Sequence, residues 1–350
     1  MSGRAPLARS IICRAIIAAL MMLALAASVH AQGKYVVGRT IYRGKVLERI
    51  VVPGKPPTGW VPRGQYAFPH RSLASTVLAN MPAFTWCYGC SATSAAMIAG
   101  YYDNNGFPNM YTGPTNGGVC PMNNETFWGH TTYPLANDVG ECPISATHIG
   151  YDGRITNGSV EDYWVDYGNT GPDPYIVNGW TEHSPESTGD FMGTNQSKYA
   201  DQGDGGTWFF AYSDGTPLVD YTGAEPTYRD GCHGFRLYIE SRGYPVFTNY
   251  TRRVNGVSGV TNGYTFADFQ ADIQKGSPVL IQVEGHTMVG FGYDTATNTI
   301  NIKNTWDNGS DTMTWAGSYS GMQHYAVTVL EMDRPPGRAH HRRRHALACR

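Results

Sequence analysis

Three strand-like runs lie close together near the C-terminal end of the chain. They are PVLIQV, GHTMVGFGY and NTINIKNTW, at residues 278–283, 285–293 and 298–306. Turns rich in Gly and Asn separate the runs, as is typical of strands that pair with their neighbours in sequence. A short helix is predicted just before them at residues 265–273, where Thr265 and Asp268 occupy the positions of a capping box. This end of the chain therefore predicts an antiparallel sheet with one accompanying helix.

A second helix is predicted much earlier, over residues 90–102. The small and apolar residues that recur there at helical spacing are Ala92, Ala95, Ala96, Met97 and Ala99. The sequence Asp-Asn-Asn-Gly at residues 103–106 ends this helix, and Cys90 lies at its N-terminus. A helix near the front of the chain that packs against a late antiparallel sheet is an α+β arrangement. The predicted fold class is therefore α+β.

The first 31 residues have the pattern of a secretory signal. Three arginines precede an apolar run at residues 15–27, and a cleavage site is expected after Ala31. The run is shorter than the roughly 20 residues that span a bilayer. We therefore expect an exported mature protein without a transmembrane segment, which is secreted, periplasmic or held at the cell surface.

The remaining chain divides into three parts by composition. Residues 32–52 alternate like one or two strands, and a Pro- and Gly-rich linker follows, so residues 32–74 are either an accessory hairpin or a prosegment. Residues 75–332 form the predicted main domain, with short strands and turns but no clear helices between residues 107 and 264. Residues 333–350 are a basic tail that we expect to be disordered.

Charge and composition exclude several kinds of partner. The whole chain has a net charge of −2, to which the signal contributes +3 and the tail +5, so residues 32–332 carry −10. An acidic body argues against nucleic acid as a partner. The run at residues 201–206 resembles a calcium loop only loosely because it lacks a distal Glu. Cys232 and His233 are adjacent and cannot supply a four-ligand metal site alone. No metal or other cofactor is expected.

Five cysteines remain once the signal and the tail are set aside, namely Cys87, Cys90, Cys120, Cys142 and Cys232. In an exported chain an odd number indicates paired cysteines and one additional thiol. A thiol becomes a useful nucleophile when its pKa is lowered by a helix N-terminus and a nearby imidazole. Cys90 meets the first condition by position, which makes it the candidate nucleophile.

The candidate base is His286, which is flanked by Gly285 and follows a buried-looking strand. A third polar group should hold the imidazole in the correct tautomer. In NTINIKNTW the period of two places Asn304 on the core-facing side, where a buried amide needs a partner such as an imidazole N–H. Trp306 falls on the same side and is expected to shield that hydrogen bond from water.

The sequence TWCYGC also permits a different chemistry, that of a Cys-x-x-Cys dithiol oxidoreductase. Such a motif should follow a central apolar strand within a βαβ unit. The preceding residues ANMPAFTW contain Pro82 and show no sustained apolar run or alternation. A dithiol would also leave the late His and Asn segments unexplained, so this alternative is the weaker one.

Three segments together resemble a known family. CYGCSATSAAM, GHTMVGFGY and IKNTW are similar to the signature blocks of the papain-like cysteine peptidase superfamily, and most of all to the branch of bacterial leader peptidases that process double-glycine precursors. The resemblance covers residues 75–332 at its widest. It implies a two-lobe fold, with an N-terminal helical lobe and a C-terminal antiparallel sheet. It also implies a peptide or protein substrate, with Cys90 as nucleophile, His286 as general base and acid, and Asn304 as the orienting group.

The sequence departs from this family pattern in two ways. Cys90 and His286 are 196 residues apart, more than the roughly 130 to 150 usual in such enzymes, which predicts a large insertion within about 123–260. The position six residues before the nucleophile, usually an oxyanion-hole Gln, is Phe84. Gln282 is a candidate replacement donor. These departures keep open a catalytically inactive module that binds peptide or glycan at the cell surface.

The resemblance also implies a disulfide pattern. In papain-like enzymes the Cys three residues before the nucleophile commonly pairs with one a few dozen residues later. By this likeness we expect disulfides between Cys87 and Cys120 and between Cys142 and Cys232.

Overall fold

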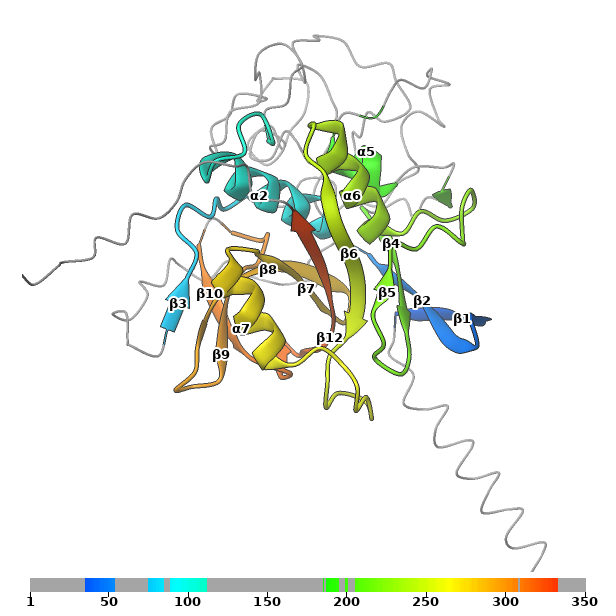
Figure 1. Cartoon of the computed structure of the whole chain (residues 1–350). Helices are drawn as coiled ribbons and strands as arrows, with labels where there is room; N and C mark the ends of the chain where they lie inside the picture. Colours follow the sequence, from blue (N-terminus) through cyan, green and yellow to red (C-terminus); the bar gives the residue numbers. More distant parts are fainter. Residues whose placement is uncertain are drawn as a thin grey trace, which may run out of the picture.

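The computed structural model describes residues 35–53, 75–84, 89–111, 185, 187–194, 199–200, 205–307 and 309–332 (Figure 1). Within them the chain combines helices with antiparallel strands, which confirms the predicted α+β class. The predicted signal segment, the basic tail, the linker after residue 53 and three of the cysteines (Cys87, Cys120 and Cys142) lie outside the described residues. No helix among the described residues is long and apolar enough to cross a membrane.

A large antiparallel sheet occupies the centre of the molecule. Its strands follow the order β10-β9-β8-β7-β12-β6-β5, with β3 beside β8 and β11 beside β12. They are β3 (Ser75–Val77), β5 (Leu218–Val219), β6 (Val246–Arg253), β7 (Val279–Val283), β8 (His286–Asp294), β9 (Thr299–Lys303), β10 (Asp311–Thr314), β11 (Ser318–Tyr319) and β12 (Met322–Met332). Strands β7, β8 and β9 are the three predicted late strands, and they pair in sequence order as expected.

Helices cover both faces of this sheet (Figure 1). Helices α2 (Cys90–Asn104), α5 (Thr188–Met192) and α6 (Gly231–Ser241) lie on one face, and α7 (Phe266–Lys275) lies on the other. The alternation along β7 explains the division, because Leu280 joins the core beneath α2 while Val279 and Ile281 join the core beneath α7. Both predicted helices are confirmed, including the reciprocal capping box of Thr265 and Asp268 at α7.

Helix α6 contradicts the expectation that residues 107–264 hold no clear helix. Its apolar residues Cys232, Phe235, Tyr238 and Ile239 form one buried stripe. Two glycines in its first turns, Gly231 and Gly234, weaken the helical signal in the sequence. Gly234 is needed because a Cβ there would lie 2.2 Å from the carbonyl oxygen of Phe191 in α5. The helix therefore forms because close packing against α5 outweighs its low intrinsic propensity.

A smaller antiparallel sheet contains β1 (Val36–Tyr42), β2 (Lys45–Val52) and β4 (Thr207–Tyr212), in the order β1-β2-β4. The predicted strands in residues 32–52 are thus confirmed as a hairpin. A buried carboxylate fastens the hairpin to the main sheet: Glu48 accepts hydrogen bonds from Arg253 at 2.5 Å and from the Tyr325 hydroxyl at 2.7 Å. Since both the arginine and the carboxylate are buried, removal of either would leave an uncompensated charge. The hairpin is therefore built into the fold.

Candidate active site

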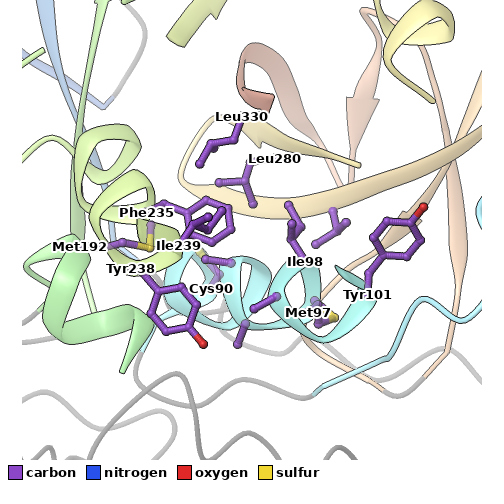
Figure 2. Close-up of a cluster of buried hydrophobic side chains, with 14 of the residues drawn as sticks. Cys90, Met97, Ile98, Tyr101, Met192, Phe235, Tyr238, Ile239, Leu280 and Leu330 are labelled. Atoms are coloured by element: carbon purple, nitrogen blue, oxygen red, sulfur yellow. The ribbon is translucent and has the colours of Figure 1, made fainter. Parts of the chain in front are cut away.

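Cys90 is the first residue of α2, and a glycine immediately precedes it. Gly89 has a φ of 113°, and a Cβ at this position would lie 2.3 Å from the carbonyl oxygen of Gly205. Only glycine fits this entry into the helix. Cys90 is fully buried, in the same apolar cluster as Phe235 and Ile239 of α6 (Figure 2). The sulfur thus lies at the positive end of the helix dipole and away from bulk water.

Thr287 joins the start of α2 to β8. Its backbone N–H donates to the Cys90 sulfur across 3.2 Å. Its hydroxyl shares a 2.8 Å hydrogen bond with the Ser91 hydroxyl, and its carbonyl accepts from the Ser94 hydroxyl at 3.2 Å. Ser91 and Ser94 are one helical turn apart, so both hydroxyls face the same strand. These contacts bring Cys90 to the backbone of the residue that directly follows His286, whereas the His286 imidazole stacks on Trp306, a member of the core cluster beneath α7.

His286 begins β8 and is fully buried. Its Nε2 lies 2.7 Å from the backbone carbonyl oxygen of Asn304. A carbonyl oxygen can only accept, so Nε2 carries the proton and Nδ1 carries the basic lone pair. Nδ1 has no hydrogen-bond partner among the residues that the structure describes. Burial lowers the pKa of His286 to about 3, against the opposing effect of the Asn304 hydrogen bond, so the imidazole is neutral at neutral pH.

Asn304 corrects one detail of the prediction. Its side-chain amide does not bond the imidazole: its Oδ1 accepts from the backbone N–H groups of Trp306 and Asp307 at 2.9 and 3.1 Å. Its Nδ2 donates to the Tyr319 hydroxyl at 3.1 Å. The amide therefore shapes the turn after β9, and the main-chain carbonyl of the same residue contacts His286.

Trp306 lies where the sequence predicts. Its ring stacks on the imidazole of His286, with 4.1 Å between ring centroids and 26° between ring planes. Both side chains are buried, so the indole shields the hydrogen bond between His286 and Asn304. Water is thereby kept from competing for the Asn304 carbonyl.

The position of the usual oxyanion donor, Phe84, and the candidate replacement, Gln282, have different surroundings in the structure. Phe84 is a core residue beneath α2, where its ring lies 5.5 Å from that of Tyr111. Gln282 is paired directly opposite Thr287, so its side chain points to the same face of the sheet as the Cys90 helix. Its Nε2 donates to the Thr328 hydroxyl at 2.9 Å, and its Oε1 has no hydrogen-bond partner among the described residues. Its role as an oxyanion donor stays a prediction.

Cys232 corrects the predicted disulfide with Cys142. It is a buried thiol in the second position of α6, and its sulfur accepts a 3.4 Å hydrogen bond from the Asn249 amide. Burial and the nearby Asp230 raise the pKa of Cys232 well above its usual value. The sulfur is therefore enclosed in the core beneath α6. The other expected pair, Cys87 and Cys120, lies outside the described residues.

Residues 219–327 match the model of the Peptidase_C39 like family. This match relates the chain to the C39-type papain-like cysteine peptidases. It confirms the family resemblance drawn from the sequence, and it contains His286, Asn304 and Trp306 but not Cys90. No curated protein and no solved structure matches the chain. Because the match begins at Val219, it includes α6 and β6, which lie inside the range where a large insertion is expected.

Sequence reasoning missed the role of Thr287, Ser91 and Ser94. The i, i+3 spacing of the two serines on a helix of otherwise small and apolar residues is the one signal that pointed to a polar contact. Their partner is separated from them by more than 190 residues in the chain. Only the paired strands bring that partner to the helix.

Proposed function

We propose that the chain is an exported thiol peptidase with a papain-like two-lobe arrangement, in which Cys90, His286 and Asn304 act on peptide bonds. One observation carries the proposal: the backbone N–H of Thr287 donates to the Cys90 sulfur at 3.2 Å, across 197 positions of sequence. This contact joins the thiol to the residue that follows His286, a neutral histidine whose tautomer is set by the Asn304 carbonyl. The family match supports a cysteine peptidase relationship for the segment that supplies this histidine.

The proposed reaction begins with proton transfer from the Cys90 thiol to Nδ1 of His286. The thiolate attacks the carbonyl carbon of the scissile bond, and the tetrahedral intermediate collapses when the imidazolium returns the proton to the leaving amine. A thioester between Cys90 and the acyl part of the substrate remains. His286 then removes a proton from water, which attacks the thioester and releases the carboxylic acid and the free thiol.

Each supporting residue has a physical task in this scheme. The carbonyl of Asn304 keeps the proton on Nε2, so that Nδ1 carries the lone pair that accepts a proton in the proposed reaction. The backbone N–H groups at the start of α2 supply the first stabilisation of the oxyanion, and Gln282 is the candidate for the second. A single such donor contributes about 2.7 to 4 kcal/mol of transition-state stabilisation. Gln282→Ala thus measures how much this enzyme depends on it.

The deciding experiment is alkylation of the mature protein with iodoacetamide at mildly acidic pH, with the modified residue located by mass spectrometry. We expect selective labelling of Cys90 and loss of that selectivity in His286→Ala. His324→Ala is the matched control, because His324 is equally buried and lies opposite the same residue, Val283, on β12. Labelling of Cys232 in preference to Cys90, or equal effects of the two substitutions, would contradict the proposal.

Digestion of a peptide library by the same preparations then tests hydrolysis itself. A selectively reactive Cys90 without cleavage of any peptide would leave the inactive peptide- or glycan-binding module as the better description. Reversible closure of a bond between Cys87 and Cys90 under mild oxidation would favour the dithiol oxidoreductase. Because Cys90 is fully buried, the substrate must displace the residues that cover the sulfur, and a small alkylating reagent detects that opening independently of turnover.

A further inference from the structure

A groove lies on the smaller sheet, between its outer face and the loop that precedes α6. It has an empty volume of about 680 Å³ including its open mouth. Its floor comes from β1 and β2, and aromatic rings form its walls. The residues used below are Gly38, Thr40, Arg49, Phe210, Tyr221 and Tyr228. None of the candidate catalytic residues lines this groove.

Arg49 provides the charge in the groove. Its guanidinium lies 4.2 Å from the ring centroid of Tyr228 and 5.3 Å from that of Trp208. Its side chain makes no hydrogen bond or ion pair with any other residue that the structure describes, and its Nε is buried without a partner. The neighbouring Arg39, by contrast, pairs at 2.8 Å with Glu48, a carboxylate that it shares with Arg253. The rings therefore hold one positive charge in place while leaving its hydrogen bonds unused.

Gly38 lets this charge reach the edge of the sheet. It pairs with Arg49 in the register of β1 and β2, and a Cβ on Gly38 would lie 3.3 Å from Nη2 of Arg49. The guanidinium thus extends over β1. Over residues 38–42, β1 pairs with β2 on one side only, and no described strand occupies its other side. A row of backbone N–H and C=O groups therefore lies beside a fixed guanidinium.

We propose that β1 and this groove bind an extended acidic peptide, whose backbone pairs with β1 and whose Glu or Asp carboxylate contacts Arg49. An exposed strand edge recognises extended peptides through main-chain hydrogen bonds and alternate side chains. A guanidinium fits a carboxylate in a bidentate geometry. The edge of β1 favours a peptide over inorganic phosphate, which has no backbone to pair with the strand. Phe210 and Tyr221 receive the apolar side chains that flank the acid.

The test uses the full mature chain carrying Cys90→Ala, so that binding is measured without turnover and independently of the proposed peptidase activity. The probe is a fluorescein-labelled pentapeptide of alternating Val and Glu, and fluorescence anisotropy gives its Kd. We expect Arg49→Gln to weaken binding about tenfold or more, since hydrogen bonds between charged groups are the strong ones. Arg43→Gln, which removes an exposed arginine from the same hairpin, should change Kd less than about twofold.

Two further measurements complete the test. Gly38→Val should abolish binding, because the valine side chain fills the space between the guanidinium and the strand edge. The φ of Gly38 is not in the left-handed region, so the strand tolerates the change. The same pentapeptide with Gln in place of Glu should bind at least about tenfold more weakly. Equal binding of the two peptides, or equal losses in the Arg49 and Arg43 variants, would overturn the proposal. Tighter binding of inorganic phosphate or of an acidic sugar than of the Glu peptide would overturn the choice of ligand.

Discussion

Cys90 and Cys232 are placed alike in the backbone and differently in their chemistry. Each lies in the first turn of a helix, and each is fully buried. The residue before α2 is Gly89, which has no side chain to occupy the N-terminal N–H groups. The residue before α6 is Asp230, whose carboxylate accepts from the Cys232 N–H at 3.3 Å. The N-terminal N–H groups of α2 are therefore not bound by the side chain of the preceding residue, whereas one N–H at the start of α6 is bound by the Asp230 carboxylate.

The second difference is what faces each sulfur from the sheet. Cys90 receives the N–H of Thr287, the residue that follows His286. Cys232 receives the side-chain amide of Asn249, and burial together with the nearby Asp230 raises the pKa of its thiol. A helix N-terminus is thus insufficient to activate a thiol. The proposed activation of Cys90 therefore depends on His286 on the facing strand and on the absence of an acidic residue in the first turn of α2.

Replacing each of the two cysteines by alanine in turn should give the largest difference in kcat between the two sites. Cys90→Ala removes the nucleophile and should lower kcat by about 10⁴-fold or more, because no other group can form the thioester. Cys232→Ala removes a buried thiol that has no role in the proposed reaction. The kcat of this variant should therefore stay within a few-fold of the parent value. Initial rates on a peptide substrate selected from the library measure both. Comparable losses in the two variants would show that Cys90 has no special role.

Asn304→Ala should have an intermediate effect. The backbone carbonyl that holds His286 is retained in alanine, while the side-chain bonds that shape the turn are lost. We expect kcat to fall about tenfold, and stability to fall by about 1 to 3 kcal/mol, as for other buried hydrogen-bond losses. Loss of a group that orients the imidazole through its own side chain costs nearer 10⁴-fold. A fall of that size with unchanged thermal stability would show that the amide itself orients His286.

Much of this arrangement could be predicted from local sequence. The capping residues Thr265 and Asp268, the alternation of β7 to β9 and the small residues of α2 are all short-range signals, and the structure confirms each. The order of the Cys, His and Asn segments was enough to assemble a candidate site. These features depend on residue type and spacing within about 15 positions, which sequence patterns preserve.

The missed features depend on contacts that no local pattern encodes. Helix α6 forms despite Gly231 and Gly234, because the backbone of α5 approaches too closely for a side chain. The group that holds His286 is a backbone carbonyl, which every residue possesses, so the type of residue at Asn304 cannot indicate it. The contact between Thr287 and Cys90 likewise uses a main-chain N–H. The tertiary structure decides which of these main-chain groups makes the contact, and the identities of the side chains do not indicate it.

Two buried hydroxyl groups, one on each side of the comparison, give a smaller and more specific test. Thr287→Val removes the 2.8 Å hydroxyl contact with Ser91, and keeps the backbone N–H that reaches the Cys90 sulfur. We expect kcat to fall about three- to tenfold with KM nearly unchanged, as for loss of one hydrogen bond that positions the helix. Tyr238→Phe removes a comparably short buried contact, the 2.9 Å hydrogen bond from its hydroxyl to the Met110 carbonyl, on α6, the helix that carries Cys232. This control variant should lower the free energy of unfolding by a similar amount and leave kcat unchanged. If kcat fell equally in both variants, the effect of Thr287→Val would be due to general destabilisation.

The pH dependence of stability should differ in sign between His286, on the strand whose next residue contacts α2, and Asp230, at the start of α6. Burial lowers the pKa of His286 from 6.5 to about 3. Between these values the unfolded chain binds a proton that the folded chain does not, so stability is complete above pH 6.5 and is lost as the pH falls, at about 1.4 kcal/mol per pH unit. His324, whose pKa burial also lowers to about 3, adds an equal slope. His286→Gln should therefore reduce the acid slope measured by urea unfolding by about 1.4 kcal/mol per pH unit.

Burial raises the pKa of Asp230 well above its usual 3.8, which gives the opposite sign. The folded carboxyl keeps its proton at pH values where the unfolded one has lost it, so its contribution is present below pH 3.8 and is lost as the pH rises. Asp230→Asn keeps an acceptor for the Cys232 N–H and cannot ionise. It should raise the free energy of unfolding at neutral pH, by an amount that shrinks as the pH is lowered. A variant less stable than the parent at pH 7 would mean that the charged carboxylate is what the start of α6 requires, and the contrast with Gly89 would then rest on the histidine alone.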